Sequence, residues 1–423
     1  MNRHYHIPVY RLLQYSLCVA MLLLCGSCYA QTDSTRSETD VVDIYRKLFR
    51  SRSHAAKPNK STIAFLPAVG YNPSIGFQMG VNFTGGMYLG DKKTTNLSIG
   101  ALGGYITTKG IVSFQFRHNV FTEGNRWNFQ GNWQIAKIVT LDYGVGTGID
   151  QPHDALIIYG IPTNYDSTVF PIQYRYIRFF EKAYKEVAPH FFIGAGASID
   201  MRSNIKDKNL DSTHITPHYT YSTYEGFNTT HYNANGFLLN VQYNTRDQLN
   251  RPYHGTYADL GIRVNETFIG SSANAIQLLS EFREYIPLSH RNPSHVLAFW
   301  YWGNFLLSGK IPYLELPGTG SDMFNRSGRG YTIGRFKGKS FAYAESEYRF
   351  PISQNGFVGG VVFANVQSGT NNLNSGFLEY WEPAAGAGLR FLFNKNTRTN
   401  ICIDYAVGRF GSNGFFLGLN EAF

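Results

Sequence analysis

Cysteine is almost absent from this sequence once its first 30 residues are set aside. Three of the four cysteines fall within those residues, and only Cys402 lies beyond them. A single thiol has no partner in its own chain, so an internal disulfide is excluded for residues 31–423. The fold of this region therefore depends on burial and hydrogen bonding, without covalent cross-links.

Charge and long apolar runs are also scarce. Charged residues make up 16% of the chain, against about 25% in ordinary soluble domains. Beyond residue 30, no stretch reaches the roughly 18 apolar residues of a membrane-spanning helix. Aromatic residues (16%) and glycine (43 residues) are abundant. This combination is typical of a transmembrane barrel, whose strands alternate apolar and polar side chains.

The first 30 residues have the pattern of a secretory signal. Arg3 and Arg11 precede an apolar core over residues 17–24, and Ala30 supplies a small residue at the expected cleavage position. We predict a signal peptide over 1–30, cleaved after Ala30; export together with a transmembrane barrel predicts location in the outer membrane of a Gram-negative cell. The alternative is a lipoprotein signal at Cys28, but the leucine usual three residues before such a cysteine is missing.

Residues 31–60 form a short polar segment. Val41, Ile44, Tyr45 and Leu48 recur there at helical spacing. An isolated helix this short is marginal in water, so we expect a linker with a surface helical turn. A plug of the lumen, or a helix for a periplasmic partner, is the alternative.

From residue 61 to 423 the sequence alternates as β-strands do. In 237–246, Phe237, Leu239, Val241 and Tyr243 occupy one face and polar side chains the other. Residues 398–405 and 415–423 show the same period of two. About sixteen such segments predict an all-β fold, a transmembrane antiparallel β-barrel. A soluble sandwich of two sheets is the alternative, but its edge strands would need protection.

Loop lengths support the barrel. Four short segments fall at one expected end, which we assign to the periplasm: 90–93, 122–125, 353–356 and 394–396. Three long segments fall at the other, outer end: 139–168, 204–232 and 309–339. Short periplasmic turns and longer outer loops are what bacterial barrels have.

Four stretches carry a resemblance to a known family. They are 61–81, the turn 243–257 that ends in Gly-Thr-Tyr, the Arg-Gly-Tyr sequence at 329–331, and the pair 386–390 with 403–405. In this order they resemble the barrel of the BamA/TamA superfamily, also called the bacterial surface antigen family. Two features depart from it. Residues 31–60 are too few for a periplasmic polypeptide-transport-associated domain, and Asn365 stands where the family tends to have an aspartate.

The resemblance implies a lock inside the lumen. In that family the arginine of the loop after the eleventh strand reaches inward to carboxylates on far strands. Here that implies a lock of Arg329, Gly330 and Tyr331 with Glu347 or Asp404. Local alternation agrees, because charge facing lipid at mid-bilayer costs about 2–4 kcal/mol, so the charged faces of 341–350 and 400–405 belong to the lumen. The alternative is an arginine that is simply solvated on an outer loop.

The two edges of the barrel are the second candidate site. Pro67 in the first strand lacks a backbone donor, and Gly414 and Gly418 weaken the last strand. Such a seam could open sideways, as associated with insertase relatives, or the residues could only bend the barrel. The alternating apolar residues of the last strand predict a C-terminal assembly signal: Phe415, Leu417, Leu419 and Phe423.

The resemblance implies a role in outer-membrane biogenesis, with protein or lipid inserted or moved through a lateral seam and no enzyme activity. The alternatives are a passive or plugged channel with ligand-binding outer loops, and an outer-membrane lipid hydrolase or lipase partner. We expect no catalytic residue, no metal site and no cofactor. The net charge of +9 comes without a Lys/Arg-rich block, so nucleic acid is not an expected partner. Expected partners are outer-membrane lipids and lipopolysaccharide, the barrel-assembly machinery that takes this chain as a client, and periplasmic or surface proteins.

Overall fold

The computed structural model describes residues 38–41, 43–44, 62–72, 76–148, 169–211, 214–370, 377–395 and 397–423, with the backbone alone for 62–72. The expected signal peptide lies outside these residues, as does most of the segment 31–60. Within them the chain forms sixteen strands. In chain order they are β1 (Thr62–Asn72), β2 (Gly76–Met87), β3 (Ser98–Thr107), β4 (Val112–Phe121), β5 (Trp127–Asp142), β6 (Phe170–Ala188), β7 (Phe191–Asp207), β8 (Tyr232–Asn244), β9 (Gly255–Asn265), β10 (Ala275–Pro287), β11 (Val296–Gly309), β12 (Ser340–Pro351), β13 (Val358–Gly369), β14 (Glu382–Asn394), β15 (Thr399–Gly408) and β16 (Asn413–Leu419).

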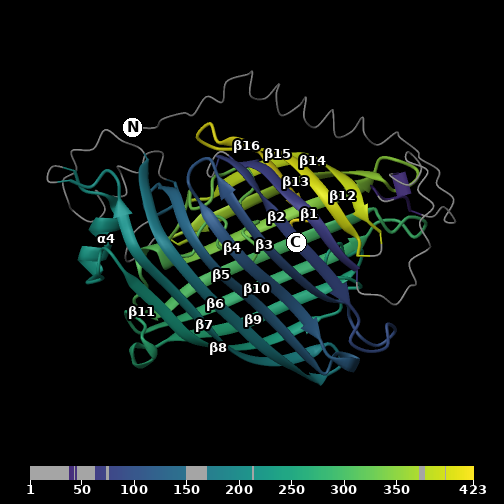
Figure 1. Ribbon diagram of the computed structural model, residues 1–423, viewed down its shortest axis with the longest axis horizontal. Coiled ribbons are helices and arrows are strands. Elements are labelled where there is room, and N and C mark those ends of the chain that lie inside the picture. The colour runs from purple at the N-terminus through teal and green to yellow at the C-terminus, as the bar shows by residue number, and fades with distance from the viewer. Residues whose placement is uncertain are drawn as a thin grey trace, which may run out of the picture. The chain divides into compact units, whose positions relative to one another are not determined.

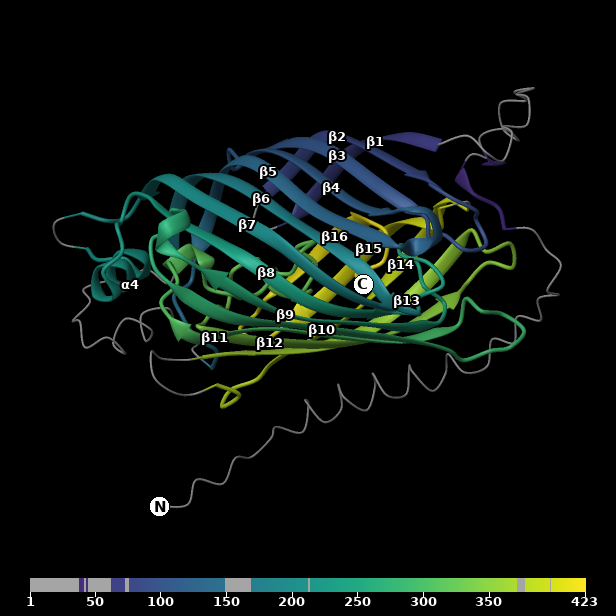
Figure 2. The ribbon, with the colours of Figure 1, turned by 90° about the horizontal axis from the view of Figure 1, so that it is seen from below.

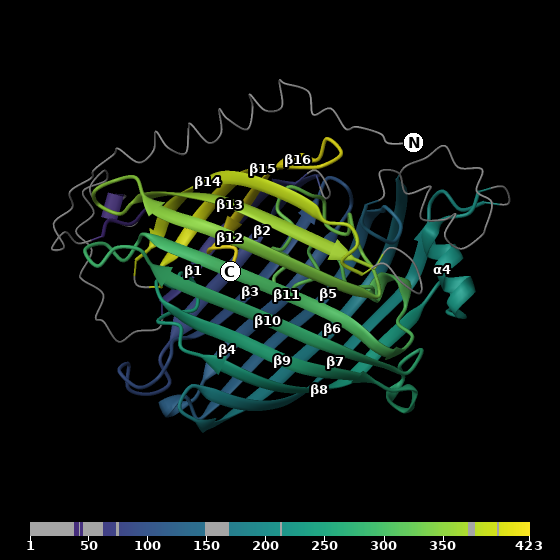
Figure 3. The ribbon, with the colours of Figure 1, turned by 180° about the vertical axis from the view of Figure 1, so that it is seen from behind.

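All sixteen strands belong to one antiparallel sheet, in which each strand pairs with its neighbours in sequence. Strands β3–β8 form the wall nearest the viewer in Figure 1, and β9–β13 form the nearest wall in Figure 3, so the sheet curves back on itself. Its two edges, β1 and β16, come to lie side by side. Within the described chain no hydrogen-bonded ladder joins them. The fold is the predicted antiparallel barrel, with one unladdered seam between β1 and β16.

The two faces of the sheet differ as the alternation predicted. In β8, Leu239 is 62% exposed on the outside, whereas Asn240 and Gln242 are buried on the inside. In β15, Tyr405 faces outward and Asp404 is buried. An apolar outer face suits lipid, and a polar inner face suits a lumen that is filled with protein and water.

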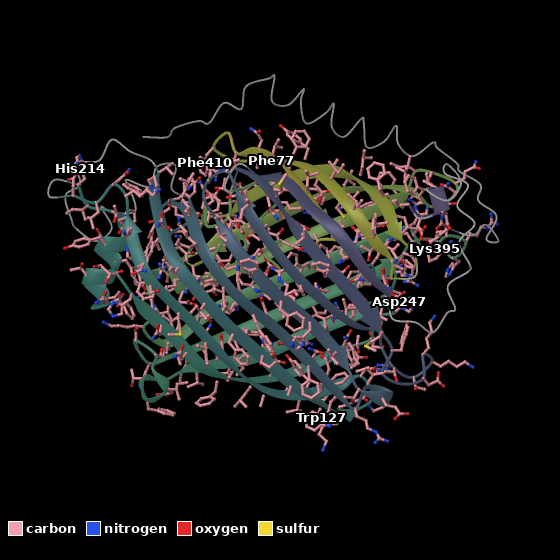
Figure 4. All side chains as sticks on the ribbon, viewed as in Figure 1. Phe77, Trp127, His214, Asp247, Lys395 and Phe410 are labelled. Carbon is pink, nitrogen blue, oxygen red and sulfur yellow. The ribbon has the colours of Figure 1, made fainter. Side chains whose placement is uncertain are left out.

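The longest connections lie at one end of the barrel. Figure 4 labels Trp127, Asp247 and Lys395 toward one end, where the short turns lie, and His214 at the opposite end. The three longest connections join strand ends at that opposite end: β5 to β6, β7 to β8, and β11 to β12. The second of them contains α4 (Pro217–Glu225), which begins at an N-cap provided by Thr216 and ends at Gly226 in the left-handed conformation (φ 82°). No helix of the described residues is long and apolar enough to span a membrane.

The described part of the N-terminal segment, 38–41 with 43–44, is fastened to the turn end of the barrel. The Thr39 backbone N–H donates to the Asn355 carbonyl at 3.0 Å. Lys395 donates its Nζ to Asp43 at 2.7 Å and its backbone N–H to Asp40 at 3.2 Å. This stretch, where we expected a linker with a surface helical turn, contacts the β12–β13 and β14–β15 turns.

Candidate functional site: an ion network inside the barrel

The connection between β11 and β12, residues 310–339, folds into the lumen instead of extending away from it; we call it the lumen loop. Near its start Tyr313 donates to Asp142 of β5 at 2.8 Å, and near its end the Lys337 ammonium pairs with the same carboxylate at 2.8 Å. At its far turn the Met323 carbonyl accepts a hydrogen bond from the Asn132 side chain of β5 at 3.2 Å. Strand β5 therefore holds one side of the loop.

Local hydrogen bonds shape the tip of the lumen loop. The Asp322 carboxylate accepts backbone N–H groups of Phe324, Arg326 and Ser327, at 3.0, 2.9 and 2.7 Å. An aspartate that caps the following backbone in this way is a local turn device. The turn reverses the chain just before Arg329 and directs that side chain toward β12–β15.

Arg329 is the centre of the site and is only 4% exposed. Its Nη1 donates to Asp404 of β15 at 2.7 Å, its Nε reaches Glu345 of β12 at 3.4 Å, and its Nη2 contacts both Glu345 and Glu347 of β12. The guanidinium carbon lies 3.5 Å from the centre of the Phe363 ring. One loop cation therefore joins three carboxylates on two strands.

The network continues beyond Arg329 through two further arginines. The Nε of Arg349 donates to Glu347 at 2.8 Å. Arg390 of β14 contacts Asp404 and donates its Nε to Glu421 at 2.6 Å. These groups are almost fully buried. Removing one partner of a buried pair typically costs about 3–5 kcal/mol, because the other charge is left uncompensated.

Gly330 and Tyr331 complete the predicted Arg-Gly-Tyr motif. Gly330 has φ 102°, and a Cβ there would lie 2.7 Å from the Ala384 side chain, so glycine alone fits. The Tyr331 hydroxyl donates to the Pro383 carbonyl at 2.7 Å and accepts the Arg409 backbone N–H at 2.9 Å. Burial raises the pKa of Tyr331 to about 12, so at neutral pH the residue serves as a neutral donor. The motif packs the loop against β14 and the end of β15.

The last four residues, 420–423, form a tail that turns into the barrel. In all three ribbon views the C-terminus lies within the outline of the strands (Figures 1 to 3). Phe423 is 3% exposed and stacks on Trp300, with ring centres 5.3 Å apart. The Arg349 Nη2 donates to the Phe423 carbonyl oxygen at 2.9 Å. Ring packing and a guanidinium thus anchor the chain end to the inside of β11 and β12.

Two contacts join this tail to the ion network and to the lumen loop. Burial raises the pKa of Glu421, but the charges of Arg390 and Arg349 outweigh it and leave that pKa below its ordinary value. Arg326 of the loop donates to the Leu419 carbonyl at 2.9 Å and also contacts the Glu421 carbonyl. The loop and the chain end are therefore bound to each other.

The seam residues are spread over the two edge strands. Pro67 lies in β1 opposite Val81 of β2. Gly414 and Gly418 lie in β16, opposite Ala406 and Cys402 of β15. A Cβ at Gly418 would meet no atom of the described residues within 4 Å.

The structure brings together all five residues of the expected lock, because Arg329 contacts both Glu347 and Asp404. Sequence reasoning placed Glu345 and Arg349 on the same face as Glu347 without making them partners. Four further participants were missed: Glu345, Arg349, Arg390 and Glu421. Alternation had already placed Glu345 and Arg349 on the lumen face, and the same rule applied to β14 could have added Arg390, which is buried on that face.

The residues of the expected assembly signal do not share one face. Phe415 and Leu417 are exposed on the outside of β16, at 54% and 46%, whereas Phe423 is buried inside. Alternation no longer predicts the face of a side chain beyond Leu419, because the strand ends there and the tail turns inward. Their role as an assembly signal stays a prediction.

A family model and one solved structure agree with this architecture. A family model described as the Omp85 superfamily domain matches residues 69–418. BamA from Haemophilus ducreyi lacking POTRA domains 1-3 has a similar fold, with a TM-score of 0.52 at 15% identity over 86% of this chain and 70% of that one. CdiB from Escherichia coli aligns with a TM-score of 0.49 at 7% identity, over 88% of this chain and 62% of that one. CdiB from Acinetobacter baumannii aligns with a TM-score of 0.47 at 11% identity, over 85% of this chain and 65% of that one. The chain thus spans less than two thirds of the CdiB chains. A search of curated proteins found no match.

Proposed function

Because the chain belongs to the Omp85 superfamily, a family of outer-membrane insertion and translocation barrels, we propose that it inserts or moves protein or lipid across its own β1–β16 seam. No covalent chemistry is part of this proposal. The observation that carries it is the seam itself, where the two edge strands are neighbours without a ladder in the described chain.

The energetics of the seam support a lateral opening. Backbone ladders are the obligatory hydrogen bonds of a barrel, and lipid offers no substitute for them. A seam that lacks a ladder has fewer bonds to break when its strands separate. The short strand β16, with seven residues, and its glycines reduce those bonds further.

The proposed setting follows from the family and from the charge pattern. The protein resides in the outer membrane, and residues 1–30 are proposed to direct its export and to be removed. The proposed partners are outer-membrane lipids and lipopolysaccharide, protein partners at the periplasmic or outer surface, and the assembly machinery that receives this chain as a client. Sequencing the N-terminus of the mature protein tests the cleavage after Ala30.

Locking the seam tests the proposal directly. One cysteine replaces Phe65 or Pro67 of β1 and the other replaces Phe415 or Leu417 of β16, in a Cys402→Ser background. The combination that oxidises efficiently is used. The control places cysteines at Ala195 and Leu239, a registered pair of the β7–β8 ladder. Outer-membrane integrity, protein assembly and conductance in planar bilayers are measured with and without reductant.

Loss of integrity or assembly only in the oxidised seam variant, restored by reductant, is the expected result. Unchanged function with steady conductance would instead favour the channel. Activity toward lipid esters that survives the lock would favour the hydrolase. Impairment by the β7–β8 control as well would show only that the barrel tolerates no cross-link.

A further inference from the structure

A cavity of about 180 Å³ lies inside the barrel near its turn end. Its wall includes side chains from β4, β9 and β10, the turn between β8 and β9, the tip of the lumen loop and the C-terminal tail. A single water needs about 10–15 Å³ of such volume. The cavity therefore has room for on the order of ten waters, or for a ligand group of comparable size.

The wall of this cavity is rich in arginine. Arg117, Arg246, Arg283 and Arg326 reach it from four separate segments. Arg283 is neutralised by an ion pair with Glu281. Among the residues that the structure describes, the other three guanidinium groups form no ion pair with a carboxylate. Three positive charges are thus gathered around one cavity without an anionic partner.

Two of these arginines are held by neutral groups. The Arg246 Nε donates to the Asn244 side chain at 3.1 Å, and its guanidinium carbon lies 4.2 Å from the centre of the Tyr257 ring. Arg326 donates to two backbone carbonyls of the chain end, one of them that of Leu419. Such contacts fix the position of each guanidinium and leave its charge available.

Arg117 is the least satisfied of the three. Its Nε is buried and has no hydrogen-bond acceptor in the described chain. Its guanidinium carbon lies 5.5 Å from the centre of the Phe324 ring at the loop tip. A buried donor without an acceptor costs about 1–3 kcal/mol, so a ligand that accepts this hydrogen bond would be stabilised.

The nearby carboxylates are already engaged. Glu421, which lines the cavity, is bound by Arg390. Asp322 accepts three backbone N–H groups of the loop turn. Neither carboxylate therefore neutralises the three arginines by direct contact.

A second, smaller cavity adjoins the first. It lies among β2, β3, β15 and β16, and the two cavities share Ile99, Ala101, Asn250 and Asn420 as lining residues. Gly86 of β2 and Leu419 of β16, which belong to strands beside the seam, also line it. The arginine-lined cavity is thus continuous with the seam region at the turn end of the barrel.

We propose that the arginine-lined cavity is a binding site for a phosphate group. Arginine presents a planar fork of donors that matches phosphate oxygens, and charge-assisted hydrogen bonds to phosphate are among the strongest in proteins. A phosphate placed among Arg117, Arg246 and Arg326 satisfies the orphaned Nε and relieves the mutual repulsion of three cations. The group is carried by a phospholipid headgroup that reaches the cavity beside the seam, or by free phosphate. The site exists whether or not the seam opens.

Binding is measured on the folded full chain in maltoside detergent. Isothermal titration calorimetry with inorganic phosphate tests the free anion. Native mass spectrometry after addition of phosphatidylglycerol or phosphatidylcholine tests the lipid source. The variants are Arg117→Gln and Arg246→Gln, which remove charge but keep hydrogen-bonding capacity. Arg175→Gln, on an exposed outward position of β6, removes the same charge elsewhere and serves as the matched control.

We expect the unchanged protein to bind at least one phosphate probe. Each cavity variant should weaken this binding about tenfold, a loss of about 1.4 kcal/mol of binding free energy. Arg175→Gln should leave the binding unaffected. Preference for phosphatidylglycerol over phosphatidylcholine with weak binding of inorganic phosphate identifies a lipid ligand. Tight binding of inorganic phosphate without a preference for phosphatidylglycerol identifies a soluble ligand. Heat-dependent mobility of each variant in gels confirms that it is folded.

Absence of binding by the unchanged, folded protein overturns the proposal. So does binding that Arg175→Gln weakens as much as the cavity variants do, because attraction would then be to overall charge. The seam lock described above leaves this site in place, so the two proposals fail separately.

Discussion

Strands β6 and β16 show two different ways of holding a barrel together. β6 has 19 residues and pairs along nearly its whole length with β5 on one side and β7 on the other. β16 has seven residues, pairs only with β15, and has no ladder on its outer side in the described chain. Beyond the end of β16, three arginines in the lumen bind the tail: Arg326 contacts the Glu421 carbonyl, Arg390 donates to the Glu421 carboxylate, and Arg349 donates to Phe423. The edge is thus fastened from inside, by contacts that side-chain changes can remove.

The wall around β6 also carries a polar pair, but one with a different consequence. His118, Gly131 and Glu181 are opposite one another on β4, β5 and β6. The His118 Nε2 lies 3.2 Å from Glu181 across the glycine, and the Trp133 indole donates to the same carboxylate at 3.0 Å. They lie two or four positions from exposed apolar residues such as Phe114, Ile135 and Phe179, on the same face of the sheet, so this pair faces the membrane. Since ladders already hold this wall, the pair should matter much less than the lumen network.

Arg329→Ala should have the largest effect. It leaves Glu345, Glu347 and Asp404 buried without their shared cation, at a cost of about 4 kcal/mol. The temperature at which the folded band is lost in a gel assay, and the urea midpoint in micelles, should both fall. Arg291→Ala, at an exposed turn position, is the control. Unchanged heat resistance of Arg329→Ala would rule out the lock.

Phe423→Ala should have the next largest effect. It should lower the free energy of unfolding by about 3 kcal/mol, as truncation of other buried aromatic residues does. This variant separates two roles. An anchor in the lumen predicts a folded protein that unfolds at lower urea and whose tail carboxypeptidase digests faster. A pure assembly signal predicts less folded protein in the membrane, with unchanged stability once folded. Phe415→Ala, on the outer face, should not expose the tail.

Acidification should weaken the tail at the Glu421 contacts. The folded pKa of Glu421 lies below its ordinary value, and an unfolded glutamate titrates near pH 4.3. This group therefore stabilises the folded state above about pH 4.3, and its contribution is lost as pH falls through the folded pKa. Digestion of the tail by an acid-active carboxypeptidase should be slow at pH 6 and faster at pH 3. In Glu421→Gln the digestion rate should not share this dependence; an equal dependence would point to other groups.

Gly131→Ala should have the smallest effect and lower the free energy of unfolding by about 1 kcal/mol. The added Cβ would lie 2.2 Å from the His118 Nε2 and 2.4 Å from a Glu181 oxygen. Both atoms are ends of side chains that can rotate away, so the pair breaks while the ladder stays. The urea midpoint of Gly131→Ala is compared with that of Gly124→Ala. An added Cβ at Gly124 would meet no atom within 4 Å, but φ there is 64°, so this control reports the cost of backbone strain without side-chain contact. A loss as large as that of Arg329→Ala would contradict the contrast drawn between wall and edge.

Much of the fold could be predicted from the sequence because the barrel rests on local alternation. Period two in 237–246 and 398–405 gave the correct inner and outer faces, and the short and long segments that we expected at opposite ends do lie at opposite ends. The Arg-Gly-Tyr motif falls between β11 and β12, as the strand count placed it. Arg329 lies 18 residues from Glu347 and 75 from Asp404, its two expected partners, so family resemblance, together with the charged inner faces, was needed to join them.

The rest of the site was beyond such reasoning for physical reasons. Alternation holds only while the backbone stays extended, and it failed at Leu419, where the strand ends. The inward turn of Glu421 and Phe423 depends on contacts with Arg390 and Trp300, which are distant in sequence. The three arginines around the cavity come from a strand, a turn and a loop, and no local pattern brings these together.

Hydrogen–deuterium exchange tests the central claim most directly. Peptides from β16 with the tail (413–423) and from β7 (191–207) are compared in the folded protein, with and without Arg329→Ala. We predict that β16 exchanges much faster than β7, and that the substitution accelerates exchange in 413–423 while leaving 191–207 unchanged. Equal, slow exchange in both peptides, unaffected by the substitution, would contradict an edge that is held from inside the barrel.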